Sequence, residues 1–156
     1  TTLAHYLELL ASAGMLTGLS KYSPRLVRKR GSSPKLQVFN TCLMTAQSGM
    51  TLAQAKKDTE YWGHLVESAV GAHLINAAAA GECEVYYWRD RNREVDFVLR
   101  HANKVTAIEV KSGQRRDTLP GMTAFAAAHG DVKRLLVGAD GIPLETFLSS
   151  PVSTWL

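Results

Sequence analysis

The chain has 156 residues, of which 46% are apolar and 21% charged, and this length suits one compact domain or two very small ones. The composition excludes a wholly disordered chain and a collagen-like repeat. No apolar run reaches about 18 residues and no basic segment leads into an apolar one at the start, so the sequence predicts neither a transmembrane helix nor a signal peptide. Two cysteines without metal-type spacing, Cys42 and Cys83, favour a reducing, cytoplasmic setting.

Positive charge is concentrated near the start of the chain. The formal net charge is +4, and residues 1–40 hold six cations against one anion, whereas residues 41–156 hold twelve cations against thirteen anions. Such a basic segment can bind nucleic acid, bind an acidic partner, or serve only as a solvated turn. The chain also starts without methionine, with helical periodicity already running, so we expect it to be a piece of a longer protein.

The first forty residues predict a helix followed by a basic hairpin. The elements expected from apolar spacing and turn residues are a helix over 3–13, a short apolar run over 15–20, and two strands over 25–30 and 35–40. A helix followed by a basic hairpin is typical of the end of a winged helix. Residues 1–40 therefore predict a winged-helix remnant, followed by a connector over residues 41–57.

The rest of the chain predicts the order helix, three strands, helix, strand. The expected elements are a helix over 52–80, strands over 84–88, 94–100 and 105–111, a helix over 119–128, a strand over 132–137, and a short helix or turn over 143–148. Short connections join the first three strands and predict an antiparallel meander, whereas the last strand follows a helical crossover and predicts a parallel neighbour. We therefore expect an α/β domain with a mixed sheet over residues 58–156.

The strand over 105–111 carries two charged residues on one face. Glu109 and Lys111 lie two residues apart and share a face, while Ile108 and Val110 point to the other. The apolar neighbours predict a buried strand, in which a carboxylate and an ammonium group need partners. Two interpretations stay open: a structural ion pair, or a metal site with an activating lysine.

Asp96 is expected to lie opposite Glu109, because a turn over residues 101–104 sets that register. Alternation along the strand is expected to place Val95, Phe97 and Leu99 on one face and Glu94, Asp96 and Val98 on the other. Two carboxylates directly opposite each other repel unless a cation lies between them. Two carboxylates and a backbone carbonyl are oxygen ligands that suit Mg²⁺ or Mn²⁺. A register shifted by one residue would instead move Asp96 to the other face relative to Glu109.

A third carboxylate, Glu67, lies on the long expected helix. Gly63 and Gly71 flank it four residues away on either side, and each glycine costs about 1 kcal/mol inside a helix. The pair indicates close packing against the sheet, or access for a substrate beside Glu67. The alternative is an exposed glutamate between two glycines that serve packing.

The order of elements and these residues resemble the core of PD-(D/E)xK nucleases. In that superfamily an acidic residue closes one strand, Glu-x-Lys lies on the next, and a further glutamate comes from the preceding helix; Asp96, Glu109 with Lys111, and Glu67 stand at those positions. The chain also resembles the C-terminal domain of unknown function of a prokaryotic P-loop ATPase family, in which an AAA-type ATPase module and a winged helix come first. The segments that carry this resemblance are Tyr61–Glu67, Tyr86–Arg89, Glu94–Leu99 and Ile108–Ser112. One departure is Asn40-Thr41-Cys42, where the family has Asp-x-Gly.

The resemblance implies a restriction-endonuclease-like fold and Mg²⁺-dependent hydrolysis of phosphodiester bonds in nucleic acid, with DNA as the expected substrate. It implies Mg²⁺ or Mn²⁺ held by Asp96, Glu109 and the Val110 carbonyl, with Glu67 acting through water or a second ion. Lys111 would position or help deprotonate the attacking water. The residues expected to contact nucleic acid are Arg25, Arg28, Lys29, Arg30, Lys35, Arg115 and Arg116. The ATPase module would lie outside this chain.

Two other interpretations of the same residues stay open. The domain can be a non-catalytic module that binds DNA through the basic hairpin or docks onto the ATPase, since members of a fold can lose their chemistry. Alternatively, Glu109 and Lys111 form only a structural ion pair and Asp96 points to solvent.

Overall fold

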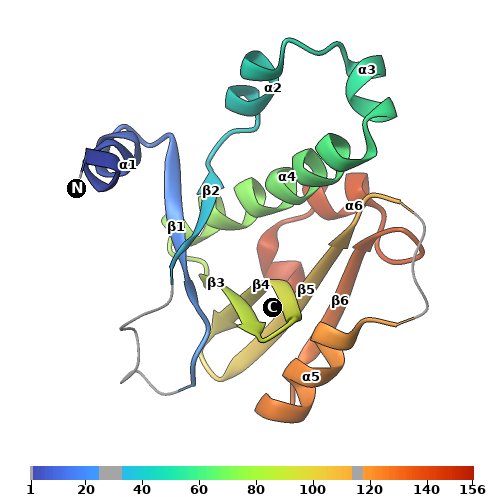
Figure 1. Cartoon of the computed structure of the whole chain (residues 1–156). Coiled ribbons are helices and arrows are strands. Elements are labelled where there is room, and N and C mark those ends of the chain that lie inside the picture. Colours follow the sequence, from blue (N-terminus) through green and yellow to red (C-terminus); the bar gives the residue numbers. More distant parts are fainter. Residues whose placement is uncertain (1, 25–32, 114–117) are drawn as a thin grey trace.

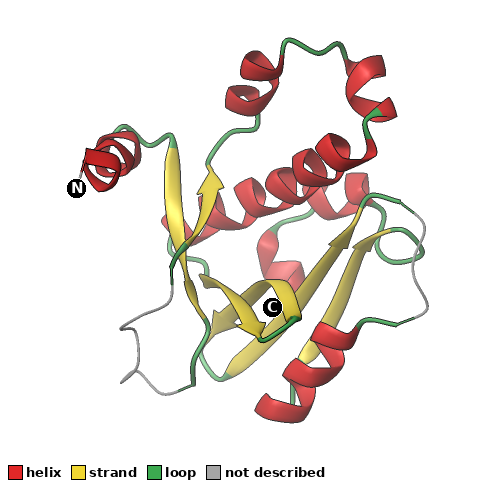
Figure 2. Cartoon of the chain, viewed as in Figure 1, coloured by secondary structure: helices red, strands yellow, loops and turns green. Residues whose placement is uncertain are grey.

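Six strands form one mixed sheet with helices on both faces, in a computed structural model that describes residues 2–24, 33–113 and 118–156 (Figure 1, Figure 2). The strand order is β2-β1-β3-β4-β5-β6. In chain order the elements are α1 (Thr2–Ser12), β1 (Leu16–Lys21), β2 (Lys35–Val38), α2 (Cys42–Ser48), α3 (Leu52–Lys57), α4 (Thr59–Ala79), β3 (Glu84–Asp90), β4 (Arg93–His101), β5 (Lys104–Lys111), α5 (Pro120–His129), β6 (Lys133–Gly138), α6 (Leu144–Ser149) and a 3-10 turn, η1 (Val152–Trp155). The α/β class and the mixed sheet expected from the sequence are confirmed.

The central strands pair as the connection lengths predict. β3, β4 and β5 form an antiparallel meander, and β6 lies parallel to β5 after the α5 crossover. Along β4 and β5, Phe97 lies opposite Ile108 and Arg100 opposite Val105. The register expected from the turn over residues 101–104 is therefore confirmed up to Phe97.

The first two strands extend the same sheet. β2 pairs with β1 in antiparallel fashion, and β1 lies parallel to β3 through Ser20 and Lys21. The strand expected over 25–30 lies outside the described residues. In the part described, β2 pairs with β1. The winged-helix assignment of residues 1–40 stays a prediction. Helix α2 lies within the expected connector.

The helix expected over 52–80 is interrupted at Asp58. α3 ends there and α4 begins, because the Asp58 backbone is extended and its carboxylate accepts a hydrogen bond from the Tyr61 N–H at 3.0 Å. An aspartate in this position satisfies a free N–H group of the first helical turn and favours a helix start.

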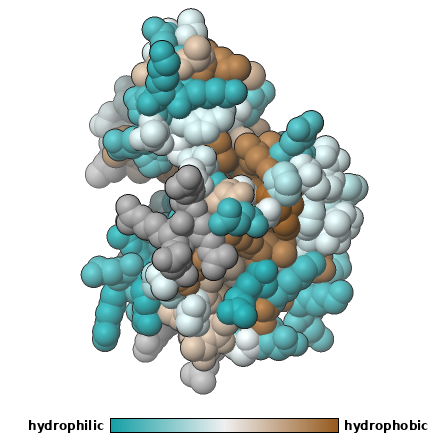
Figure 3. Space-filling view, turned by 90° about the vertical axis from the view of Figure 1, so that its right-hand side faces the viewer, coloured by the Kyte–Doolittle hydropathy of each residue, from teal (hydrophilic) through white to brown (hydrophobic). Residues whose placement is uncertain are grey.

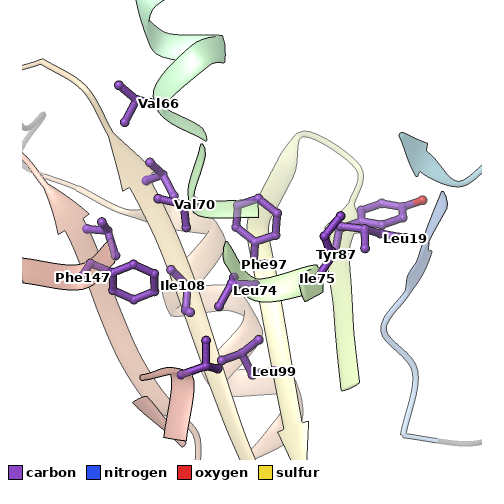
Figure 4. Packing of buried hydrophobic residues seen from close by; sticks show 13 residues of the cluster. Leu19, Val66, Val70, Leu74, Ile75, Tyr87, Phe97, Leu99, Ile108 and Phe147 are labelled. Atoms are coloured by element: carbon purple, nitrogen blue, oxygen red, sulfur yellow. The ribbon is translucent and has the colours of Figure 1, made fainter. Parts of the chain in front are cut away.

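Two apolar layers hold the helices to the sheet. On one face, α4, α6 and η1 cover a cluster that includes Val66, Val70, Leu74, Ile75, Phe97, Leu99, Ile108 and Phe147 (Figure 4). On the other face, α5 covers a cluster that includes Tyr22, Trp88, Val95, Val98, Met122 and Phe125. Among the helices described, none combines the length and apolar character needed to cross a membrane.

A β-bulge in β4 breaks the expected alternation beside Asp96. The pairing of β3 with β4 shifts by one residue next to Tyr87, so that Asp96 and Phe97 both lie opposite this one residue. Val95 consequently packs in the α5-side cluster while Phe97 packs against α4, and the expected placement of both on one face is wrong. Bulges of this kind re-aim a side chain, here that of Asp96.

Candidate active site

The four residues expected to form the catalytic site line one cavity of about 520 Å³. They are Glu67 from α4, Asp96 from β4, and Glu109 and Lys111 from β5. The sheet and α4 thus bring together three segments that are far apart in the chain. Lys35, Leu36 and Gln37 from β2, His64 and Ser68 from α4, and Glu94 from β4 complete the lining.

Asp96 lies where the β4–β5 pairing stops. Its Oδ2 accepts a hydrogen bond from the Val110 N–H at 2.8 Å, and its side chain is 16% exposed. Burial, reinforced by the nearby negative charges of Glu109 and Glu67, raises the pKa of this carboxyl to about 7, against the opposing effect of the Val110 hydrogen bond and of Lys35. Asp96 therefore changes its charge near neutral pH.

Glu109 and Lys111 form the ion pair that one interpretation expects. The Lys111 ammonium donates to Glu109 Oε1 at 2.7 Å. Burial lowers the pKa of Lys111, but the hydrogen bond to Glu109 and the attraction of the carboxylates outweigh it and leave the pKa raised. The second carboxylate oxygen, Glu109 Oε2, is buried and has no hydrogen-bond partner within the described part of the chain. A structural ion pair alone gives no reason for this buried, unpartnered acceptor.

Lys35 lies among the carboxylates. Its Nζ is 2.6 Å from Glu67 Oε1, 3.6 Å from Glu94 Oε1 and 3.9 Å from Asp96 Oδ1. Burial lowers the pKa of Lys35, but attraction to Glu67 and the other carboxylates outweighs it, so the pKa is raised. Sequence reasoning assigned this lysine to a basic nucleic-acid-binding hairpin, and no local pattern pointed to the acidic cavity.

Glu94 is a second residue of the cavity that the sequence did not predict as a site residue. It lies two positions before Asp96, its carboxylate is 3.6 Å from the Lys35 ammonium, and Arg89 Nε approaches its other oxygen at 3.9 Å. The Glu-x-Asp spacing was an available signal, because residues two apart on a strand can serve the same side.

The two glycines around Glu67 have different surroundings. A Cβ added at Gly71 would lie 2.2 Å from Gln37 Oε1, whereas a Cβ at Gly63 would lie 3.5 Å from Ser112 Oγ. Close packing against the sheet is therefore confirmed at Gly71. Glu67 itself is paired with Lys35 and its side chain is 28% exposed, so the alternative of a freely exposed glutamate is not found.

Six of the residues expected to contact nucleic acid lie outside the described residues: Arg25, Arg28, Lys29, Arg30, Arg115 and Arg116. Of that expected set the structure describes Lys35, in the position given above. Within residues 2–24, 33–113 and 118–156, no three His, Cys, Asp or Glu side chains converge closely enough to hold one ion in this conformation. The Lys35 ammonium lies among the carboxylates instead.

Two further cavities lie beside α5, and one of them adjoins the first cavity. One of about 490 Å³ shares Glu94, Glu109 and Lys111 with it and extends to the start of α5. Another, of about 800 Å³, lies between α5 and β6 and is lined mainly by apolar residues. The space-filling view of that side of the molecule shows apolar surface framed by hydrophilic side chains (Figure 3). The cavity of about 800 Å³ contains none of the clustered carboxylates, so the candidate site is the cavity of about 520 Å³.

The sequence of the chain matches one known protein family. The profile described as a domain of unknown function (DUF4143) matches residues 62–146, which is more than half of the chain. The chain belongs to the DUF4143 family. The matched segment of this DUF4143 domain contains Glu67, Asp96, Glu109 and Lys111, whereas Lys35 precedes it.

Among solved structures, protein VC1899 from Vibrio cholerae is similar to the DUF4143 domain at 17% sequence identity and a TM-score of 0.29. The alignment covers 88% of this chain and 33% of that protein, so the chain spans about a third of its length. No curated protein matches the sequence.

Proposed function

We propose that this DUF4143 domain is a metal-dependent nuclease that hydrolyses phosphodiester bonds in DNA. The observation that carries the proposal is the buried Oε2 of Glu109, which has no hydrogen-bond partner among the described residues and lies in one cavity with Asp96 and Lys111. A buried carboxylate oxygen without a hydrogen-bond partner, beside a second carboxyl whose pKa is raised to about 7, is typical of a functional site.

The residues fit a divalent cation. Mg²⁺ is held in proteins through one or two carboxylates with waters completing its shell, so it does not require a closed cage of protein ligands. In the proposal, Asp96, Glu109 and the Val110 carbonyl hold Mg²⁺ or Mn²⁺, and Glu67 acts through water or a second ion. The bound ion would supply Lewis-acid polarisation of the scissile phosphate. Since a ligand carboxyl must be deprotonated, the raised pKa of Asp96 makes ion binding stronger above neutral pH.

Lys111 is proposed to stabilise the negative charge that develops on the phosphate during hydrolysis. The carboxylates around it raise its pKa, so the ammonium stays charged near neutral pH. A charged ammonium orients the attacking water and stabilises the negative charge that develops on the phosphate oxygens, rather than accepting a proton itself. Its side chain is 41% exposed, which leaves it open to a substrate entering the cavity.

The element order supports the PD-(D/E)xK part of the proposal. α4, the meander β3–β5, α5 and β6 follow the αβββαβ order of that core, and the four residues lie on the elements that the resemblance implies. The resemblance also supports a place for the domain at the C-terminus of AAA-type ATPase-like proteins. In the proposal, an ATPase module and a winged helix precede the domain in such a protein.

A non-catalytic nucleic-acid-binding or ATPase-docking module is the second candidate. The position of Lys35 favours it, because in this conformation an ammonium group satisfies Glu67 at 2.6 Å and lies near Asp96. A site whose carboxylates are permanently paired with a lysine would hold the fold together without chemistry.

Cleavage of end-labelled DNA separates the two candidates. The protein is incubated with duplex and single-stranded DNA, and with RNA of the same sequence, in Mg²⁺, Mn²⁺ or EDTA. We expect metal-dependent cleavage that falls about 100-fold or more in Glu109→Gln and in Lys111→Gln. Lys133→Gln, which changes an exposed lysine of β6, is the matched control and should leave cleavage unchanged. Salt-sensitive DNA binding without cleavage under all conditions would contradict the nuclease and support the binding module.

A further inference from the structure

We propose that Lys35 is an internal counter-ion of the carboxylate cavity, and that the Lys35 ammonium and a divalent cation compete for the carboxylates of Asp96 and Glu67. The inference rests on the proposed metal-dependent function and adds to it a residue that precedes the segment matched by the family.

The Lys35 ammonium contacts oxygens from two elements of the cavity. Nζ of Lys35 lies within 4 Å of carboxylate oxygens on Glu67, Glu94 and Asp96. It also lies 3.5 Å from the backbone carbonyl oxygen of Asp96. One lysine side chain thus reaches oxygens of both α4 and β4. Of these residues, Asp96 is a proposed ligand of the ion, and Glu67 is proposed to act through water or a second ion.

The backbone of Lys35 is fixed although its side chain is long. Lys35 pairs with Leu19 across β1 and β2. The preceding residue, Pro34, packs so closely on β1 that a Cβ at Gly18 would lie 2.9 Å from its ring. The lysine stem ends over the Phe97 ring, with Nζ 5.2 Å from the ring centroid, and the side chain is 22% exposed. Four methylenes between a fixed backbone and the ammonium allow the charge to withdraw while the strand stays in place.

The Lys35 ammonium and a bound divalent cation are expected to compete because both carry positive charge. Clustered carboxylates repel one another unless a cation lies among them, and Lys35 supplies that cation in the ion-free domain. A divalent ion bound to Asp96 would lie only a few ångströms from the ammonium, where like charges repel strongly in a partly buried cavity. Ion binding therefore displaces the Lys35 ammonium, and removal of the ammonium strengthens ion binding.

Calorimetric titration with Mn²⁺ tests the competition directly. We expect Lys35→Met to bind Mn²⁺ about tenfold or more tightly than the wild type, a difference of about 1.4 kcal/mol or more. Lys21→Met, which removes an exposed lysine from β1, is the matched control and should bind as the wild type does. In the wild type, Mg²⁺ titration followed by NMR of ε-¹³C-labelled lysine should shift the Lys35 signal over the same concentrations that saturate ion binding.

The outcomes separate this inference from the proposed function. Equal or weaker Mn²⁺ binding by folded Lys35→Met overturns the inference and leaves the nuclease proposal standing. If Lys35→Met does not fold, the wild-type NMR titration decides, and a Lys35 signal that does not move while Mg²⁺ binds overturns the inference. Failure of both proteins to bind Mn²⁺, alone and with DNA, overturns the metal-dependent function and the inference with it.

Discussion

Neutralising Asp96 is expected to stabilise the domain at alkaline pH. Burial and the charges of Glu109 and Glu67 raise the pKa of this carboxyl from 3.8 to about 7. The unfolded chain therefore loses this proton near pH 4, whereas the folded domain keeps it until about pH 7. Because the folded state binds more protons between these values, its stability falls as the pH rises through this window. Below pH 4 the penalty is absent, and above pH 7 it is complete.

The magnitude follows from the same two pKa values. Each pH unit between them corresponds to about 1.4 kcal/mol, which gives a full penalty of about 4 kcal/mol. Part of this penalty is already present at pH 5, so the change between pH 5 and pH 8 is about 2–3 kcal/mol. Asp96→Asn removes the charge, and the amide oxygen of asparagine can still accept the hydrogen bond from the Val110 N–H.

Urea unfolding in EDTA, at pH 5 and pH 8, measures the effect. The free energy of unfolding of Asp96→Asn, relative to the wild type, should increase by roughly 2–3 kcal/mol from pH 5 to pH 8. Asp140→Asn, which changes an exposed aspartate after β6, should show no such increase. A difference between Asp96→Asn and the wild type that is the same at both pH values would refute the reasoning, because it would show that Asp96 titrates alike in the folded and unfolded states.

Three packing predictions follow from the environment of the same site, each measured by urea unfolding at one pH. Gly71→Ala should lower the free energy of unfolding by about 1–3 kcal/mol, because the new Cβ meets the buried Gln37 side chain at 2.2 Å. Its matched control in α4, Gly63→Ala, should raise the free energy of unfolding by up to about 1 kcal/mol through helix propensity. Equal effects of the two substitutions would contradict the packing argument. Gly121→Ala should lower the free energy of unfolding by about 3 kcal/mol or more, because its Cβ would lie 1.8 Å from a backbone carbonyl oxygen of β4 that cannot rotate away. A loss below about 1 kcal/mol would mean that α5 can shift. Phe97→Ala should lose about 3–5 kcal/mol, because its ring is fully buried under α4, and a surface-like loss below about 1 kcal/mol would exclude this packing.

Local pattern was sufficient for the central sheet. The short turn between β4 and β5 determined their pairing and its register as far as Phe97, because a turn of fixed length leaves one way to align the strands. The parallel position of β6 followed from the helical crossover through α5. The helix boundary at Asp58 had a signal that periodicity concealed: Thr51 and Gln54 form a capping box for α3, and Asp58 caps α4.

The bulge at Asp96 had no signal in the sequence of β4. Whether a strand inserts an extra residue depends on how the neighbouring strand packs, and here the shift occurs opposite Tyr87 of β3. The bulge affects the side chains that lie around the cavity. An unbroken strand would keep Phe97 on the same side as Val95, whereas the bulge lets Phe97 pack under α4 and Asp96 line the cavity with Glu67.

Lys35 shows why the site could not be completed from local pattern. Its charge counts toward the basic first quarter of the chain, which suggested a basic hairpin that contacts nucleic acid. It reaches the cavity only because β2 joins the sheet through β1, and that long-range pairing leaves no periodic mark near Lys35. The contacts of Lys35 with Glu67 and Asp96 cross the domain boundary predicted at residue 58. A fragment over residues 58–156 would keep the four predicted catalytic residues but lose Lys35, one of the two lysines that line the cavity, so β2 forms part of the cavity as well as of the sheet.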